Sequence, residues 1–466
     1  MSNTFQDIEF KFSNFAGMSS CAIRLSDLTL ITGPNSSGKT YAVYAVYSFL
    51  KNLRDFIQIP SQPRHALALL RDGVVDLDLT EIAKIDHSKS VAVAFKNSLP
   101  HYFSVPDDFF DDATIDVKLP PVDVLSLQRT LRLQVRKDLA VELVKESGRM
   151  SCSLSILSED ANVSFTKPPY ALTAMRRAIQ RTVIDLLFGN LWVNTFAITS
   201  ERTGISLFWK ELDINKNQII EKLISFKGKK IDPWEFVEDQ TSRYALPITD
   251  NIDIARDADN VAKQKSFISE DPELKSYIRP IFDELAGGKY KYSKEGISFE
   301  YGAARKKKTL IPIYVASSST KSLFLLDLFI NHIAEKGDLL VFDEPELNLH
   351  PANQRLMAQL LVRLVSIGIK VIITSHSDFL IREINNRIML SKSFPGAADL
   401  MNEYGISEKE VLDPSRVAGY LLGKDRRLQH VEVKAHGLDM RSIDEAIVGA
   451  SNLQGLILSG LASSED

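Results

Sequence analysis

The chain has 466 residues, of which 44% are hydrophobic and 25% are charged, with a formal net charge of −4 at pH 7. These values are ordinary for a globular protein and exclude a disordered, collagen-like or very small disulfide-stabilised chain. The length allows about three domains, or one large core with insertions. The mildly acidic balance gives no overall positive field that would attract nucleic acid, so only local basic patches could do so.

Several features predict a cytoplasmic protein with no membrane contact. Cys21 and Cys152 are the only cysteines and lie far apart in the sequence. This favours a reducing compartment over a disulfide framework or a cysteine zinc site. Residues 1–12 are polar and mixed, unlike a signal peptide. The least polar long stretch, residues 186–198, is too short to span a bilayer.

In the first half of the chain, alternating apolar residues predict strands as far as residue 31, and residues 41–50 suit a buried helix. Alternation also predicts strands at 91–95 and within 125–143, where antiparallel hairpins would expose one face. Residues 170–187 have the pattern of an amphipathic helix.

The second half combines helices, a hairpin and short apolar strands. Residues 240–283 are mostly helical but interrupted by prolines, and a hairpin is predicted over 290–301. Helices at 323–334 and 355–365 then alternate with short apolar strands at 339–342 and 370–374. Such alternation indicates parallel βαβ units, so we expect an α/β fold with a mixed or parallel core sheet.

The clearest motif fits G-x-x-x-x-G-K-[ST] in full and lies between an apolar strand and an apolar helix. The two glycines would let backbone N–H groups surround a polyphosphate at the start of a helix. Lys39 would bind the β- and γ-phosphates, and the Thr40 hydroxyl would bind Mg²⁺. The predicted ligands are therefore ATP and Mg²⁺, bound by Gly33, Pro34, Asn35, Ser36, Ser37, Gly38, Lys39 and Thr40.

Two further strands each end in polar residues. The apolar run 339–342 precedes Asp343 and Glu344, at the edge where parallel sheets bind their ligands. Asp343 would hold the Mg²⁺, and Glu344 would act as the general base that polarises the attacking water. His376, after the strand at 370–374, would contact the γ-phosphate. The predicted catalytic residues are Glu344, His376 and Lys39, and the metal ligands are Thr40 and Asp343.

The runs 343–351 (DEPELNLHP) and 374–376 (TSH) resemble ABC-type ATPases, in the soluble branch that includes SMC-type repair proteins and the ATPases of OLD nucleases and anti-phage systems. The resemblance implies an ABC-type head with an antiparallel β subdomain and a helical insertion. It also implies that two heads bind ATP between them, with a signature helix of one copy contacting the γ-phosphate held by the other.

The matching signature position is Ser317, Ser318 and Ser319, which departs from the family's Ser-Gly-Gly core. Serines at a helix N-terminus can still donate hydroxyl and amide hydrogen bonds. By the same resemblance, Asn348 would lie in a dimer-spanning loop, and residues 200–204 would line the active site. An ordinary helix cap remains the alternative for the serines.

The interval from Lys39 to Asp343 spans 304 residues (343 − 39), and its many prolines argue against the long coiled coil of SMC proteins. We therefore divide the chain into four segments. Residues 1–60 and 190–400 would form the two parts of the ATPase head. Residues 61–189 would be a β-hairpin and helical insertion, and 401–466 a small C-terminal region.

The sequence contains no recognisable effector site. The tail after His376 does not have the Asp-x-Asp spacing of a Toprim nuclease, because Asp439 and Asp444 lie too far apart, and the histidines form no HNH-like cluster. The chain is most similar to ATPase subunits of anti-phage systems that act with a separate nuclease.

That resemblance implies a homo-oligomer built from head-to-head dimers and larger than a dimer, and it suggests a hexamer. It also implies a separate Toprim-type nuclease subunit. A phage protein that mimics DNA would be the trigger. The alternatives are a partner of HNH type and an SMC-like DNA-binding repair or recombination ATPase. The second alternative would use basic clusters at 227–230, 305–308 and 426–427, which otherwise are solvated loop charges. A transporter ATPase fits the signature and the insertion less well.

Overall fold

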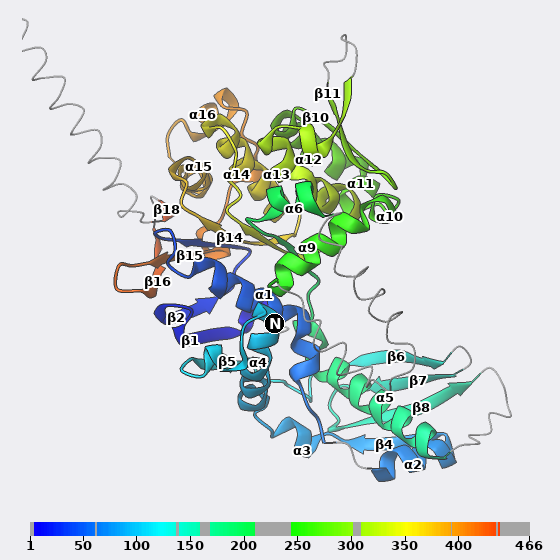
Figure 1. Cartoon of the computed structure of the whole chain (residues 1–466). Helices are drawn as coiled ribbons and strands as arrows, with labels where there is room; N and C mark the ends of the chain where they lie inside the picture. Colours follow the sequence, from blue (N-terminus) through cyan, green and yellow to red (C-terminus); the bar gives the residue numbers. More distant parts are fainter. Residues whose placement is uncertain are drawn as a thin grey trace, which may run out of the picture. The chain divides into compact units, whose positions relative to one another are not determined.

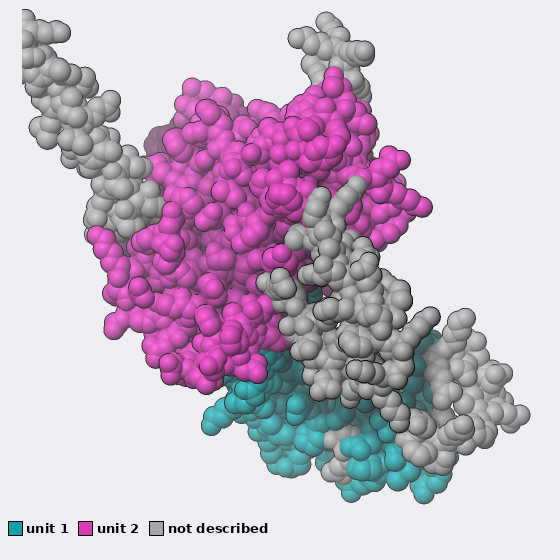
Figure 2. Space-filling view, viewed as in Figure 1, with its two compact units in different colours: residues 1–11, 49–98, 115–193 teal, residues 12–48, 99–114, 194–466 magenta. Residues whose placement is uncertain are grey.

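The computed structural model describes residues 4–60, 63–136, 139–158, 168–209, 244–301, 309–392, 394–434 and 437–438. The chain folds as two compact units, each assembled from separate stretches of sequence and coloured in Figure 2. Unit 1 contains residues 1–11, 49–98 and 115–193, and unit 2 contains residues 12–48, 99–114 and 194–466. The four segments expected from the sequence stay a prediction.

Seven strands of the main sheet lie wholly in unit 2, in the order β2-β16-β15-β3-β14-β13-β9. The pairs β9–β13, β13–β14, β14–β3, β3–β15 and β16–β2 are parallel, and β15–β16 is antiparallel. The mixed α/β fold expected from the sequence is confirmed. The strands are β2 (Met18–Arg24), β3 (Leu28–Thr32), β9 (Thr195–Ile198), β13 (Leu339–Asp343), β14 (Lys370–Ser375), β15 (Val417–Leu422) and β16 (Arg427–Val431).

The central strands are apolar because both faces of the sheet are covered. Every residue of β3 and β13 is buried, as expected for parallel strands between helical layers. Leu30, Phe342 and Ile373 from the strands belong to one core with Phe282 and Leu361 from helices. The long helices of this unit are α12 (Pro272–Ala286), α13 (Ser318–Leu328), α14 (Pro351–Ser366) and α15 (Asp378–Met389), and α1 (Lys39–Phe56) begins in it.

Shorter elements complete unit 2 (Figure 1). A three-stranded antiparallel sheet of β10, β11 and β12 precedes α13, which continues into a π-helical turn at Phe329–Ile333. The remaining elements are α6 (Arg202–Phe208), α9 (Leu246–Arg256), α10 (Ala258–Val261), α11 (Phe267–Glu270), β10 (Gly288–Ser293), β11 (Gly296–Tyr301), β12 (Thr309–Pro312), α16 (Ala397–Glu403), β17 (Val433–Lys434) and β18 (Gly437–Leu438).

Unit 1 contains an antiparallel sheet in the order β4-β8-β7-β6. The register places Leu131 opposite Leu143 and Leu133 opposite Val141, which explains the alternation seen in the sequence. Its elements are α2 (Pro63–Asp72), β4 (Val74–Asp78), α3 (Thr80–Ala83), β6 (Arg129–Arg136), β7 (Leu139–Lys145), β8 (Ser151–Ser158) and α5 (Pro168–Phe188). Strands β1 (Glu9–Phe15) and β5 (Thr114–Lys118) and helix α4 (His87–Phe103) have residues in both units.

The strand expected at 91–95 is wrong, because these residues belong to helix α4. Val91, Ala92 and Phe95 are buried, at the i, i+1, i+4 spacing of a helix face, whereas Val93 is 61% exposed. The alternation of valines was therefore accidental. The other expected helices and strands named above are present, with prolines 247 and 272 in the first turns of α9 and α12. The interruption expected at Pro280 is wrong, because this proline lies inside α12. No helix among the described ranges is long and apolar enough to cross a membrane.

Candidate nucleotide-binding site

The loop between β3 and α1 needs both of its glycines. Gly33 and Gly38 have φ values of 150° and 104°, which side-chain-bearing residues rarely adopt. A Cβ atom on Gly33 would lie 2.8 Å from the Cβ of Leu422, and one on Gly38 would lie 3.0 Å from the carbonyl oxygen of Ala16. The close approach of neighbouring residues therefore requires glycine at these two positions, whether or not a ligand is bound.

The Lys39 side chain folds back onto this loop. Its Nζ atom donates hydrogen bonds to the carbonyl oxygens of Gly33, at 2.9 Å, and Pro34, at 2.7 Å. Burial lowers the pKa of Lys39, while the nearby carboxylates of Glu344 and Asp343 oppose that shift. The loop thus presents a desolvated ammonium group that is held only by backbone carbonyls, as a phosphate-binding lysine requires.

Asp343 and Thr40 meet although they are far apart in sequence. The Thr40 hydroxyl lies 3.3 and 3.2 Å from the two carboxylate oxygens of Asp343, which also accepts a hydrogen bond from the Thr374 hydroxyl. Asp343 is completely buried, and burial raises its pKa. A bound cation would reverse this effect.

This pair fits the Mg²⁺ predicted from the sequence. Mg²⁺ is usually held by one or two carboxylates together with substrate phosphates and water. Thr40 and Asp343 supply one hydroxyl and one carboxylate, and the remaining ligands would come from phosphate and water. The described ranges contain no cluster of three or more His, Cys, Asp or Glu residues that could hold a metal by itself.

Glu344 has an unusual backbone conformation, with φ at 47°. Its N–H group lies 3.2 Å from the carbonyl oxygen and 3.1 Å from the hydroxyl of Thr374, on the neighbouring strand. A left-handed conformation at a non-glycine residue is unfavourable and persists where the surroundings hold it. The turn at the end of β13 therefore directs the Glu344 side chain away from the line of the strand.

Glu344, Glu346 and His376 lie close together. The Nδ1 atom of His376 is 3.8 Å from Oε1 of Glu344 and 3.6 Å from Oε1 of Glu346. Glu346 also accepts hydrogen bonds from the Ser375 hydroxyl and the His376 N–H. Its Oε2 atom is buried and has no hydrogen-bond partner among the described residues. A bound donor such as water would satisfy it.

Arg202 is the least expected member of the site. It is fully buried, and its guanidinium group donates four hydrogen bonds to backbone carbonyls, one of them to Asp343 at 2.9 Å and another to Glu344 at 2.7 Å. The others reach Thr199 and Ser322 at 3.0 and 3.1 Å. Burial lowers the Arg202 pKa to about 10, opposed by the nearby acidic side chains. Arg202 thus connects the end of β13 to the second turn of α13.

The three signature serines begin helix α13. Ser317 is the N-cap residue, and its hydroxyl accepts a hydrogen bond from the Thr320 N–H at 3.2 Å. The same hydroxyl lies 2.9 Å from that of Ser319, and Ser318 is exposed. The geometry matches the expected helix N-terminus. The described contacts of the serines lie within their own helix, so their role toward a second copy stays a prediction.

The segment 200–204 lies beside the loop that follows Glu344. The exposed Asn348, with φ at 64°, donates a hydrogen bond from Nδ2 to the Thr203 hydroxyl at 3.1 Å. Glu201 accepts one from the Tyr44 hydroxyl of α1 at 3.2 Å. These contacts link the segment to both predicted parts of the site.

Sequence reasoning located the motifs but missed Glu346, Thr374 and the role of Arg202. Each acts through a contact with a residue distant in sequence, which a local pattern does not reveal. The only available signal was the charged Glu-Arg pair at 201–202 after an apolar strand. Of the basic clusters, 227–230 and 305–308 lie outside the described residues, as do Asp439 and Asp444. Arg426 and Arg427 are exposed at the turn between β15 and β16.

Comparison with known proteins agrees with an ATPase. Residues 187–381 match the AAA ATPase domain family, a range that runs from the end of α5 into α15 and includes Arg202, Asp343, Glu344 and His376. The glycine-rich loop lies outside this range, and the match covers less than half of the chain. No curated protein matches the sequence.

Among solved structures, the chain is similar to the Smc head domain with an extended coiled coil, bound to the C-terminal domain of ScpA, from Pyrococcus furiosus. The identity is 12%, over 96% of this chain and 98% of that one, with a TM-score of 0.29. The SMC head domain from Thermotoga maritima has 11% identity over 91% and 98%, with a TM-score of 0.28. Because these TM-scores are low, the interpretation of the site rests on its own geometry.

Proposed function

We propose that this chain binds and hydrolyses ATP with the help of Mg²⁺. The observation that carries the proposal is the contact of Thr40 with the buried Asp343, which joins the glycine-rich loop to the strand that bears Glu344. A glycine-rich turn without a binding role would not be expected to contact a buried carboxylate 303 residues away in the sequence. The match to the AAA ATPase domain supports the same assignment.

In this proposal each residue has a defined task. Lys39 exchanges its bonds to the carbonyls of Gly33 and Pro34 for bonds to the β- and γ-phosphates. Thr40 and Asp343 hold Mg²⁺, which neutralises charge on the phosphates when bound. Glu344 accepts a proton from the attacking water. His376 lies beside Glu344 and contacts the γ-phosphate.

Completion of the site would require a second copy of the chain. Ser317, Ser318 and Ser319 would present hydroxyl and N–H donors of one copy to the γ-phosphate held by the other. Two of these serines are exposed at the start of α13, which leaves that helix end accessible. We therefore propose a head-to-head dimer with ATP between the copies, assembled into a larger oligomer.

The biological role we propose is that of a sensor and scaffold subunit in an anti-phage defence system. The chain resembles AriA, the ATPase subunit of PARIS systems. By this resemblance it would hold and release a separate Toprim nuclease subunit (AriB) on meeting a phage protein.

Expression of the chain with its neighbouring gene tests this role. We expect the neighbour's product to co-purify with the chain, to dissociate on triggering and to be toxic only after release. A Toprim neighbour would support the AriA assignment, and an HNH neighbour would support the ATPase of a Septu system. Purification of the chain alone from its native operon, without toxicity from any neighbour, would contradict the role but leave the ATPase proposal intact.

The exposed pair Arg426 and Arg427 is the one described feature that favours a DNA-binding ATPase instead. Such an enzyme would hydrolyse ATP faster when DNA is present, and the stimulation would fall steeply with salt because phosphate contacts release counterions. An Arg426→Ala/Arg427→Ala variant should then lose the stimulation. A lack of stimulation at low salt would exclude this alternative.

A further inference from the structure

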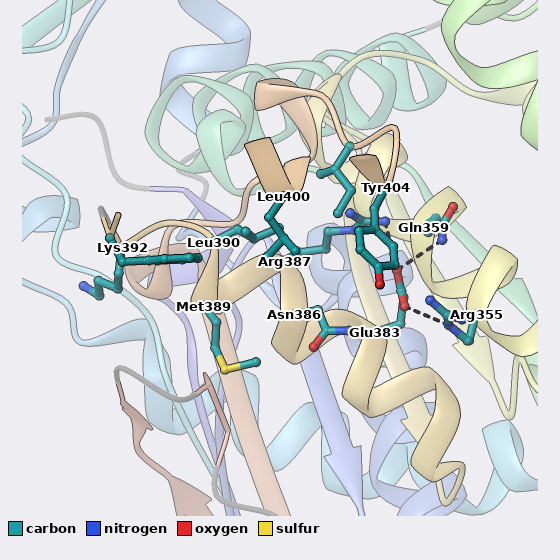
Figure 3. Close-up of a pocket in the computed structure, with 12 residues that line it drawn as sticks. Arg355, Gln359, Glu383, Asn386, Arg387, Met389, Leu390, Lys392, Leu400 and Tyr404 are labelled. Carbon is teal, nitrogen blue, oxygen red and sulfur yellow. Dashed lines mark hydrogen bonds and ion pairs between the residues drawn. The ribbon is translucent and has the colours of Figure 1, made fainter. Parts of the chain in front are cut away.

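A second cavity lies in unit 2 among α14, α15, α16 and the segments that flank α16 (Figure 3). Its volume is about 590 Å³, which is within the range of sites that bind small organic molecules. None of its lining residues belongs to the glycine-rich loop or to the Asp343, Glu344 and His376 group. The cavity is therefore separate from the nucleotide site.

Arg387 of α15 gives this cavity an unusual charge. The side chain is 2% exposed, and its Nη2 atom donates a hydrogen bond to Oε1 of Glu383 at 2.9 Å. The same atom lies 3.6 Å from Oε2 of Glu410. The Nε and Nη1 atoms are buried and have no hydrogen-bond partner among the described residues. Buried donors without partners are costly, so an acceptor at this position would be strongly favoured.

The two acidic side chains near Arg387 already have other partners, and Glu410 pairs with Arg363 at 2.9 Å. Glu383 accepts hydrogen bonds from Arg355 at 3.0 Å and Gln359 at 3.1 Å in addition to that from Arg387. The charged residues that line the cavity are three basic ones, Arg355, Arg387 and Lys392, and one acidic one, Glu383. The lining thus has two more positive than negative charges, and an entering anion would balance them.

The rest of the lining is apolar or aromatic. Met389 and Leu390 contribute from the end of α15, and Leu400 and Tyr404 contribute from α16 and the residue after it. Leu400 and Tyr404 are exposed, whereas Arg387 is buried, so the apolar groups are accessible and the charge lies deeper. A ligand for this cavity therefore needs an apolar body and one anionic end.

We propose that this cavity binds a small organic anion, namely a carboxylate attached to an aromatic or branched aliphatic body. The carboxylate would accept the free donors of Arg387 in a charge-assisted pair. The body would pack against Leu400 and Tyr404. This binding site is independent of ATP hydrolysis and of the proposed defence role.

The test uses the full-length chain and two matched pairs of probes, 4-phenylbutyrate with 4-phenylbutanol and indole-3-acetate with indole-3-ethanol. Binding is measured by calorimetry and by saturation-transfer NMR. We expect both acids to bind at least about tenfold more tightly than their alcohols, because only the acids can satisfy Arg387. Equal binding of acid and alcohol would overturn the proposal.

Variants locate the binding. Leu400→Trp should fill the accessible part of the cavity and abolish binding of both acids, and Arg387→Met should remove the preference for acid over alcohol. Leu67→Trp, at an exposed leucine of α2 in unit 1, is the control and should bind as the unaltered chain does. Circular dichroism checks that each variant is folded, and Leu400→Trp decides the matter if Arg387→Met does not fold.

Three results would contradict the proposal. Unchanged binding in Leu400→Trp would place the acids elsewhere, and loss of binding in Lys39→Ala would place them in the nucleotide site. Failure of both acids up to their solubility, with binding only of an acidic peptide, would replace the small anion with a protein partner.

Discussion

Glu344 is held from both sides of its peptide backbone. Its N–H group is hydrogen-bonded to Thr374 on β14, and its carbonyl oxygen accepts a hydrogen bond from Arg202. The side chain thereby projects toward His376 at the end of a rigid strand. A general base is effective when its position is fixed before the reaction, so the base role proposed for Glu344 would depend on these backbone contacts as well as on its carboxylate.

Replacement of Glu344 by Gln should separate ATP binding from hydrolysis. The amide keeps the shape of the side chain but cannot accept the proton from water, so we expect turnover to fall by about 10²–10⁴-fold. ATP affinity should change little, because Lys39 and Thr40 are intact. Phosphate release and nucleotide binding measure the two effects. Glu81→Gln, at an exposed position of α3, is the control, and equal turnover in wild type and Glu344→Gln would remove Glu344 from the base role.

Arg202→Met should damage both stability and turnover. The methionine fills much of the same volume but leaves the carbonyls of Thr199, Ser322, Asp343 and Glu344 without their buried donor. We expect the free energy of unfolding of unit 2 to fall by about 3 kcal/mol, since unsatisfied buried groups cost roughly 1–3 kcal/mol each and partly relax.

The decisive readout is kinetic. If Arg202 positions Glu344, kcat should fall much more than ATP affinity when the folded variant is assayed well below its melting temperature. Arg202→Lys should rescue only part of the loss, because an ammonium group cannot reproduce the planar guanidinium fork. A normal kcat in folded Arg202→Met would show that the residue is purely structural.

At this scale a local spacing in the sequence singled out Lys39, Thr40, Asp343 and Glu344, and the structure places them near one another. Their roles toward a nucleotide stay predictions. Arg202 was harder to interpret, since all four of its hydrogen bonds go to main-chain carbonyls. A main-chain carbonyl can belong to any residue type, so such hydrogen bonds cannot be predicted from the identity of the partner residues. Its role therefore became visible only with the fold.

Helix α13 combines a local and a proposed intermolecular task at one end. The Ser317 hydroxyl caps the helix, while Ser318 is exposed one residue later. Its hydrophobic residues, from Leu323 to Leu328, are buried on all sides, so packing rather than the serines holds the helix in place. This allows the first turn to be altered without loss of the helix.

Two substitutions should separate these tasks. Ser317→Ala should lower the free energy of unfolding by about 1 kcal/mol, as expected for a lost N-cap. Ser318→Ala should leave stability unchanged but reduce ATP-dependent dimerisation and hydrolysis, if the serines contact the γ-phosphate of a second copy. Thermal melts, sedimentation and ATPase assays measure these effects. Normal dimerisation and turnover in Ser318→Ala and in Ser318→Arg would leave only the capping role.

Sequence patterns predicted the elements with long periodic runs better than those with short ones. The strands β13 and β14 were predicted although they are short, because four and three consecutive apolar residues respectively favour a buried position. The alternating Val91, Val93 and Phe95 in α4 are compatible with a strand as well as a helix, and tertiary packing stabilises the helix. The late strands β15 and β16 were not predicted. β15 is apolar but contains a glycine, and β16 is mostly polar.

The two units each contain one cysteine. Cys21 lies in β2 of unit 2 and Cys152 in β8 of unit 1, and both are buried. Burial raises the pKa of each thiol from 9.0 to about 12. The folded state therefore favours the protonated thiols. Stability from this source is complete below the unfolded pKa near 9 and is lost as the pH rises toward 12.

Thiol labelling should consequently report the opening of each unit separately. In Cys152→Ser only Cys21 remains, and in Cys21→Ser only Cys152 remains. At mildly alkaline pH we expect both to react far more slowly than an unfolded control in urea, because thiolate is the reactive form and both sites are buried. ATP with Mg²⁺ should slow the labelling of Cys21 more than that of Cys152. Rapid labelling of either native variant would contradict the burial described.

Strand β3 leads into the glycine-rich loop, yet its two neighbours are β14 and β15. Leu28 of β3 pairs with Val371 on one side and Val417 on the other. Because both partners lie hundreds of residues later in the sequence, β3 leaves the ribosome long before either neighbouring strand. An apolar strand with both edges unpaired is prone to aggregate. We therefore expect a nascent chain to protect β3, through a chaperone or temporary contacts, and a nonsense codon before residue 370 would leave β3 without either of its neighbours.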